Sequence, residues 1–80
     1  MARNTIKLGT TKTARPGLTG WGKKTVSELW LVKCGKVDGK QVYAVMGFHK
    51  DENGNGAGWG HLYENTSLAD VRAWMENNSI

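Results

Sequence analysis

The sequence of 80 residues predicts an α+β fold, in which a three-stranded antiparallel β-meander carries a C-terminal α-helix packed on one face. Three observations predict it. Two apolar segments flank Asp38-Gly39, a third follows a loop with two Asn-Gly pairs, and the last segment has apolar residues at helical spacing. We expect a single domain with two parts: a basic, Gly- and Thr-rich arm over residues 1–25, irregular in structure, and a folded α+β unit over residues 26–80.

The first hairpin is expected to turn at Asp38-Gly39, because a type I′ turn needs positive φ at both central positions. Its strands cover residues 28–34 and 41–48. The simplest register pairs Cys34 with Tyr43, and the alternation of side chains then collects one aliphatic set on a single face. That set is Leu29, Leu31, Val42, Ala44, Met46 and Phe48.

A second hairpin is expected to turn at Asn53-Gly54 or at Asn55-Gly56, and both choices give the following strand the same alternation. This third strand runs from about Gly58 to Glu64. Its inward positions are expected to join the aliphatic face. They are Trp59, His61 and Tyr63.

The helix is expected to begin after Ser67, which is a good N-cap residue with Asp70 three positions later. It is expected to end at Asn77 and Asn78. Its apolar stripe should pack against the aliphatic face of the sheet. The stripe consists of Leu68, Val71, Trp74 and Met75.

The opposite face of the predicted sheet is too apolar to be left wholly in water. It carries Trp30, Val32, Cys34, Tyr43, Val45 and Leu62. Two covers are open: a partner molecule, or the arm itself, which offers Ile6, Leu8, Leu18 and Trp21.

Composition argues against several classes of protein. Cys34 is the single cysteine, so no intramolecular disulfide is expected, and a reducing cytoplasm fits best. The longest apolar stretch, residues 42–48, is far too short to span a bilayer, and no secretory signal is expected at the start. We therefore expect no membrane partner.

No metal site, cofactor, small-molecule substrate or enzymatic activity is expected. Asp51-x-Asn53-x-Asn55-Gly56 matches the first positions of an EF-hand loop, but Leu62 stands where the twelfth position needs a bidentate Glu. His49, His61 and Cys34 lack the close paired spacing of zinc ligands. Nothing in the sequence marks Cys34 as an activated nucleophile.

Charge is divided unevenly along the chain. The first 25 residues carry six positive and no negative side chains, whereas the remaining 55 carry five basic and seven acidic ones. Such an arm suits phosphate contacts, and aromatic rings beside it suit stacking on unpaired bases. We therefore predict a non-enzymatic protein that binds nucleic acid, DNA or RNA, through the arm and the adjoining sheet face. The predicted site residues are Arg3, Lys7, Lys12, Arg15, Trp21, Lys23, Lys24, Trp30 and Tyr43.

A second function of a different class is also open. A small basic protein of this kind is compatible with an inhibitor or adaptor, of the type encoded by phages or mobile elements. It would dock on a larger host protein or nucleoprotein complex, and the basic arm would then meet an acidic protein surface.

Overall fold

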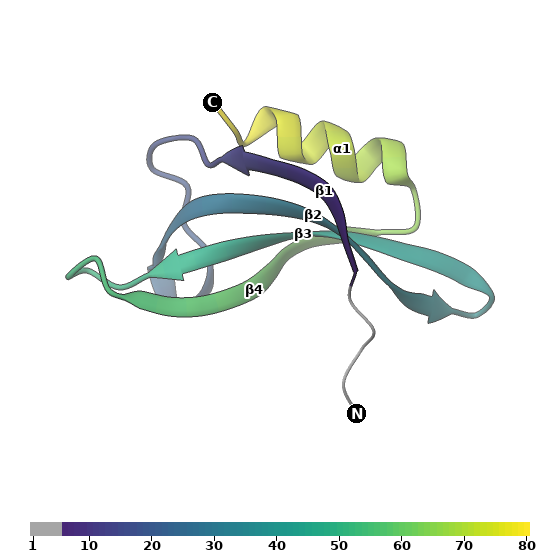
Figure 1. Cartoon of the computed structure of the whole chain (residues 1–80), viewed down its shortest axis with the longest axis horizontal. Helices are drawn as coiled ribbons and strands as arrows, with labels where there is room; N and C mark the ends of the chain where they lie inside the picture. The colour runs from purple at the N-terminus through teal and green to yellow at the C-terminus, as the bar shows by residue number, and fades with distance from the viewer. Residues whose placement is uncertain (1–5) are drawn as a thin grey trace.

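The computed structural model describes residues 6–80. Its elements are β1 (Ile6–Thr13), a 3-10 turn (Trp21–Lys23), β2 (Thr25–Val37), β3 (Lys40–Lys50), β4 (Gly56–Asn65) and α1 (Leu68–Asn77). The four strands form one antiparallel sheet in chain order, and α1 lies across one face of it (Figure 1). The α+β architecture with a C-terminal helix on the sheet is confirmed.

The sheet has four strands where the sequence predicted three, because part of the N-terminal arm is itself a strand. β1 pairs with β2, with Lys7 opposite Val32 and Lys12 opposite Leu29. The prediction of an irregular arm is therefore wrong for Ile6–Thr13, whose β-branched threonines favour extended backbone. Pro16 and the glycines that suggested irregularity fall mostly after this strand.

The helix and its cap follow the prediction. The Ser67 hydroxyl accepts a hydrogen bond from the Asp70 backbone amide at 3.3 Å, which satisfies one of the free N–H groups of the first turn. At the other end Asn78 caps the helix, and its side-chain amide donates to the Trp74 carbonyl at 2.8 Å.

The turn of the first hairpin is also confirmed, but the predicted register holds only next to it. Asp38 and Gly39 have φ values of 52° and 78°, and Lys36 pairs with Gln41 as the turn dictates. Cys34 and Gly35 then lie opposite the single residue Val42, and this arrangement of two residues opposite one is a β-bulge. The Gln41 side-chain amide donates to the Cys34 carbonyl across this bulge.

This bulge shifts the rest of the hairpin by one residue, so Leu31 pairs with Val45 and Trp30 pairs with Met46. A shift of one residue turns every side chain of the affected strand segment to the other face. Leu29 and Leu31 face the helix as predicted. The assignment to the helix side is wrong for four members of the aliphatic set, which are Val42, Ala44, Met46 and Phe48.

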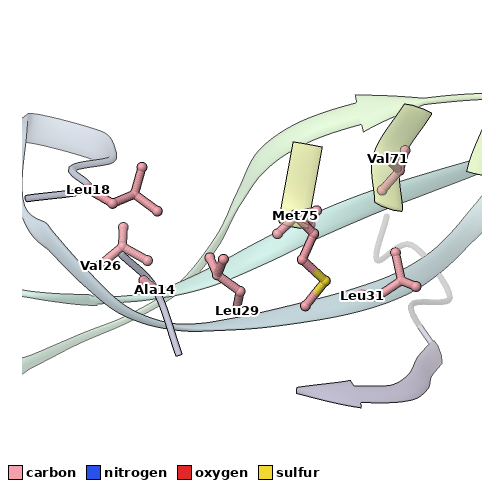
Figure 2. Packing of buried hydrophobic residues seen from close by; sticks show 8 residues of the cluster. Ala14, Leu18, Val26, Leu29, Leu31, Val71 and Met75 are labelled. Carbon is pink, nitrogen blue, oxygen red and sulfur yellow. The ribbon is translucent and has the colours of Figure 1, made fainter. Parts of the chain in front are cut away.

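The main core lies between α1 and the sheet. Figure 2 shows Val71 and Met75 pointing from the helix toward Leu29 and Leu31 on β2. Burying one such side chain completely contributes roughly 1.5–3 kcal/mol, so this layer accounts for much of the stability of the domain. The buried members are Ala14, Leu18, Val26, Leu29, Leu31, Val45, Val71 and Met75.

The sequence left open whether the arm or a partner covers the other face, and three of the arm side chains considered do not bury against it. Leu18 is buried on the helix side, together with Ala14, while Ile6 and Leu8 are exposed. The arm is therefore part of the fold, because it supplies β1 and two side chains of the main core.

Candidate nucleic-acid interface

The face of the sheet opposite α1 carries a cluster of aromatic side chains. We call it the helix-free face and define it by Lys7, Trp30, Met46, Phe48 and Trp59. Strand pairing places them together, because Trp30 lies opposite Met46 and Phe48 lies opposite Trp59. Trp30 and Met46 also pack against a buried patch of smaller side chains, which are Val32, Cys34, Val42 and Ala44.

Three aromatic rings of this face are in contact. The ring centroids of Trp30 and Trp59 lie 4.0 Å apart with an interplanar angle of 36°, and those of Phe48 and Trp59 lie 5.3 Å apart at 56°. Trp30 comes from β2, Phe48 from β3 and Trp59 from β4, so the cluster crosses three strands. All three residues are partly exposed, so ring surface remains accessible.

Polar contacts fix the orientation of Trp30. Its Nε1–H donates to a Glu28 carboxylate oxygen at 2.7 Å, and the Lys7 ammonium lies 4.0 Å from the ring centroid in a cation–π contact. On the β4 side of the face, His61 Nδ1 is bonded to the Glu64 carboxylate. The face thus combines an aromatic cluster, in which hydrogen bonding fixes Trp30, with the Lys7 ammonium above it and the carboxylates of Glu28 and Glu64 at its margins.

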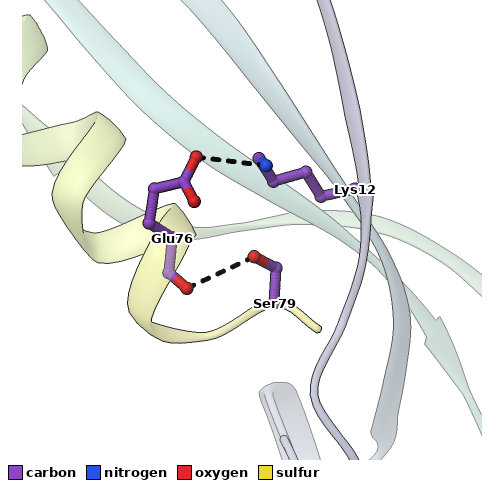
Figure 3. Close-up of polar contacts among 3 residues, drawn as sticks. All are labelled: Lys12, Glu76 and Ser79. Atoms are coloured by element: carbon purple, nitrogen blue, oxygen red, sulfur yellow. Dashed lines mark hydrogen bonds and ion pairs between the residues drawn. The ribbon is translucent and has the colours of Figure 1, made fainter.

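Three predicted site residues lie on the helix side instead. Lys12 points toward α1 and pairs with Glu76 at 3.1 Å, and the Glu76 carbonyl accepts from Ser79 (Figure 3). Arg15 donates to the Asn78 side chain at 3.1 Å. Tyr43 packs against the helix-side core, because the β2 bulge reverses the face on which the β3 side chains lie relative to the prediction. Placing Tyr43 beside Trp30 was therefore wrong.

The remaining predicted residues lie at the end of the sheet near β4. Trp21 is 60% exposed and stacks on His49, with ring centroids 5.3 Å apart. Lys23 and Lys24 line a hollow together with Asp51 and Glu52 of the β3–β4 loop. The predicted residue Arg3 lies outside the described residues.

The structure thus brings together Lys7 and Trp30, both members of the predicted site, and places beside them Trp59, Phe48 and Met46, which sequence reasoning had not included in the site. The sequence did place Trp59 and His61 on one face with Phe48 and Met46, and this grouping is correct. Tyr63 is the exception, since a second bulge turns it toward Trp74, on which it stacks at 5.6 Å. The prediction was wrong about the side of the sheet, because this group of residues faces away from the helix and not toward it.

Within residues 6–80, no group of three or more His, Cys, Asp or Glu side chains is placed to hold a metal ion. In the same part of the chain, no helix has the length and apolar character needed to cross a membrane. Comparisons of the chain with protein-family models, curated proteins and solved structures give no match.

Proposed function

We propose that this protein binds single-stranded nucleic acid, DNA or RNA, through the helix-free face and does so without enzymatic activity. The observation that carries the proposal is the contact between the Trp30 and Trp59 rings, with the Lys7 ammonium above Trp30. Partly exposed aromatic rings next to a cation are the common means by which proteins hold unpaired bases.

The energetics of stacking support this choice over duplex binding. A base stacked on an aromatic side chain contributes roughly 1–3 kcal/mol, whatever its identity, because every base has a π-face. In a duplex those faces are already stacked on one another and are not available. The helix-free face also lacks a helix, the element that typically enters the major groove.

The charges around the face suggest where phosphates would lie. Glu28 and Glu64 stand at its margins, so their carboxylates repel phosphates there, although Trp30 and His61 partly satisfy them. Bases would then occupy the centre, and phosphates would lie near Lys7. Because Lys12 and Arg15 contact the end of the helix, fewer phosphates would be neutralised than the six cations of the arm suggest.

A labelled oligonucleotide of about 12 nucleotides, titrated as a single strand and as a duplex across salt concentrations, tests this proposal. We expect tighter binding of the single strand. Its log–log salt slope should lie between about −0.7 and −2, which corresponds to one to three phosphate contacts. Deleting residues 1–25 is not a suitable control, because it removes β1 and two core side chains.

Absence of binding at low salt, or equal binding of both forms, would overturn the proposal. The second function considered from sequence, docking of an inhibitor or adaptor on an acidic protein surface, would then be favoured. The same apolar and aromatic face would serve as its contact surface.

A further inference from the structure

We propose that a cleft at the β4 edge of the sheet, between Trp21 and Trp59, binds one nucleotide unit of the strand. This inference rests on the proposed function and deepens it. The cleft has a volume of about 110 Å³. That is similar in scale to the roughly 150 Å³ cavity that admits benzene in an engineered protein, so a planar ring can enter it in part. Its lining consists of Trp21, Lys24, His49, Ala57, Gly58 and Trp59.

Trp21 is held in place although it is largely exposed. Its ring stacks on His49 at an interplanar angle of 27° and also lies against Gly60. A Cβ atom at Gly60 would come within 2.6 Å of the indole Cη2 atom, so only glycine permits this approach. A large apolar side chain that is 60% exposed contributes little to a core, whereas a fixed and accessible ring suits stacking.

His49 lines the cleft as a buried residue. The residue is 2% exposed, its Nδ1–H donates to the Gly47 carbonyl at 3.0 Å, and its Nε2 lies against Gly20. Among the described residues, Nε2 is the one buried side-chain nitrogen or oxygen without a hydrogen-bond partner. The contribution of His49 to the cleft is therefore its ring, which supports the exposed Trp21 ring from beneath by stacking.

Lys24 and Trp59 complete the recognition of a nucleotide. Lys24 lines the cleft, so its flexible side chain can bring an ammonium group to the phosphate attached to the bound base. Trp59 belongs both to this cleft and to the aromatic cluster of the helix-free face. A second, shallow hollow along β4 also joins Trp21 to Met46 and Trp59. A single-stranded nucleic acid whose bases stack on Trp30 and Trp59 can therefore continue around the edge of the sheet into the cleft.

The test uses the full chain and adenosine 5′-monophosphate as the probe. The four tryptophan indole N–H signals in an NMR spectrum are followed during the titration. We expect the Trp21 and Trp59 signals to shift and the Trp74 signal to stay in place. Trp21→Leu should weaken binding of the mononucleotide at least tenfold, while Trp74→Leu should leave it within about twofold. Trp74 is the matched control because it stacks on Tyr63 on the helix side.

Two further variants test the roles assigned to the lining. Lys24→Gln should weaken binding of the monophosphate but not of adenosine, whereas Lys23→Gln, at the neighbouring position outside the lining, should leave both unchanged. Gly60→Ala should displace the Trp21 ring and produce the same loss as Trp21→Leu, with the fold checked by circular dichroism. No shift of the Trp21 signal, or equal effects of Trp21→Leu and Trp74→Leu, would overturn the cleft.

Failure of this inference is distinguishable from failure of the proposed function. If Trp21→Leu leaves oligonucleotide binding unchanged, the proposal that the cleft binds a nucleotide is refuted. The proposal that the helix-free face binds nucleic acid is then retained. If the protein binds the mononucleotide but no single-stranded oligonucleotide, the cleft is retained as a nucleotide site and the proposed function is refuted.

Discussion

Two methionines provide a direct test of which sheet face packs against the helix. Met75 is 2% exposed and lies between α1 and β2, so Met75→Ala removes three heavy atoms from a closed core. Met-to-Ala substitutions at such sites cost about 2–5 kcal/mol, because a cavity adds to the lost transfer free energy. Met46 is only partly buried and lies on the helix-free face, where solvent can occupy the space left by truncation. We expect Met46→Ala to cost about 1 kcal/mol.

Urea unfolding followed by circular dichroism measures both costs, provided that the m-value is unchanged. A domain of this size has roughly 4–12 kcal/mol of total stability, so the larger loss should shift the midpoint clearly. Equal costs for the two variants would refute the assignment of faces. A larger cost for Met46→Ala would support the register that the sequence alone suggested.

Three other predictions concern the cap, the loop and the charges. Ser67→Ala should lower the free energy of unfolding by about 1 kcal/mol, and Ser67→Thr should recover most of it; equal stability of all three proteins would rule out the cap. Millimolar calcium should leave the melting temperature unchanged, because Asp51 already accepts two backbone amides at 2.9 Å; a rise abolished by Asp51→Ala would contradict this. Lys7→Gln should flatten the salt slope of oligonucleotide binding by about 0.7, whereas Lys12→Gln, whose ammonium pairs with Glu76, should not; the reverse order would misplace the phosphates.

The parts of the fold that depend on local signals were predictable from the sequence. Ser67 with the apolar stripe after it defines the helix, and Asp38-Gly39 defines the turn, because each needs only a few neighbouring residues. The fourth strand was missed because Ile6–Thr13 lies in a segment rich in charge and glycine. Its pairing with β2 is a long-range interaction that no local pattern announces.

The assignment of β3 side chains to the two faces of the sheet depended on one extra residue in β2. The bulge at Cys34 and Gly35 is stabilised by a hydrogen bond from the side chain of Gln41, which forms only in the assembled hairpin. Sequence periodicity alone favours an uninterrupted ladder, so Tyr43 was placed on the wrong face. Charge and aromatic content placed Lys7 and Trp30 in the predicted site, since those properties do not depend on register.

The measurement that tests the central claim most directly is the affinity of a single-stranded oligonucleotide for three variants at one salt concentration. These are Trp30→Leu, Trp59→Leu and the control Trp74→Leu, each shown to be folded. Leucine keeps apolar bulk but lacks a π-face, so the first two should each raise the Kd by about 5- to 150-fold, as expected for the loss of one stacked base. The control should match the unmodified protein, because Trp74 stacks on Tyr63 at the helix side. Unchanged affinity in the first two variants, or an equal loss in all three, would contradict the claim that the helix-free face binds the strand.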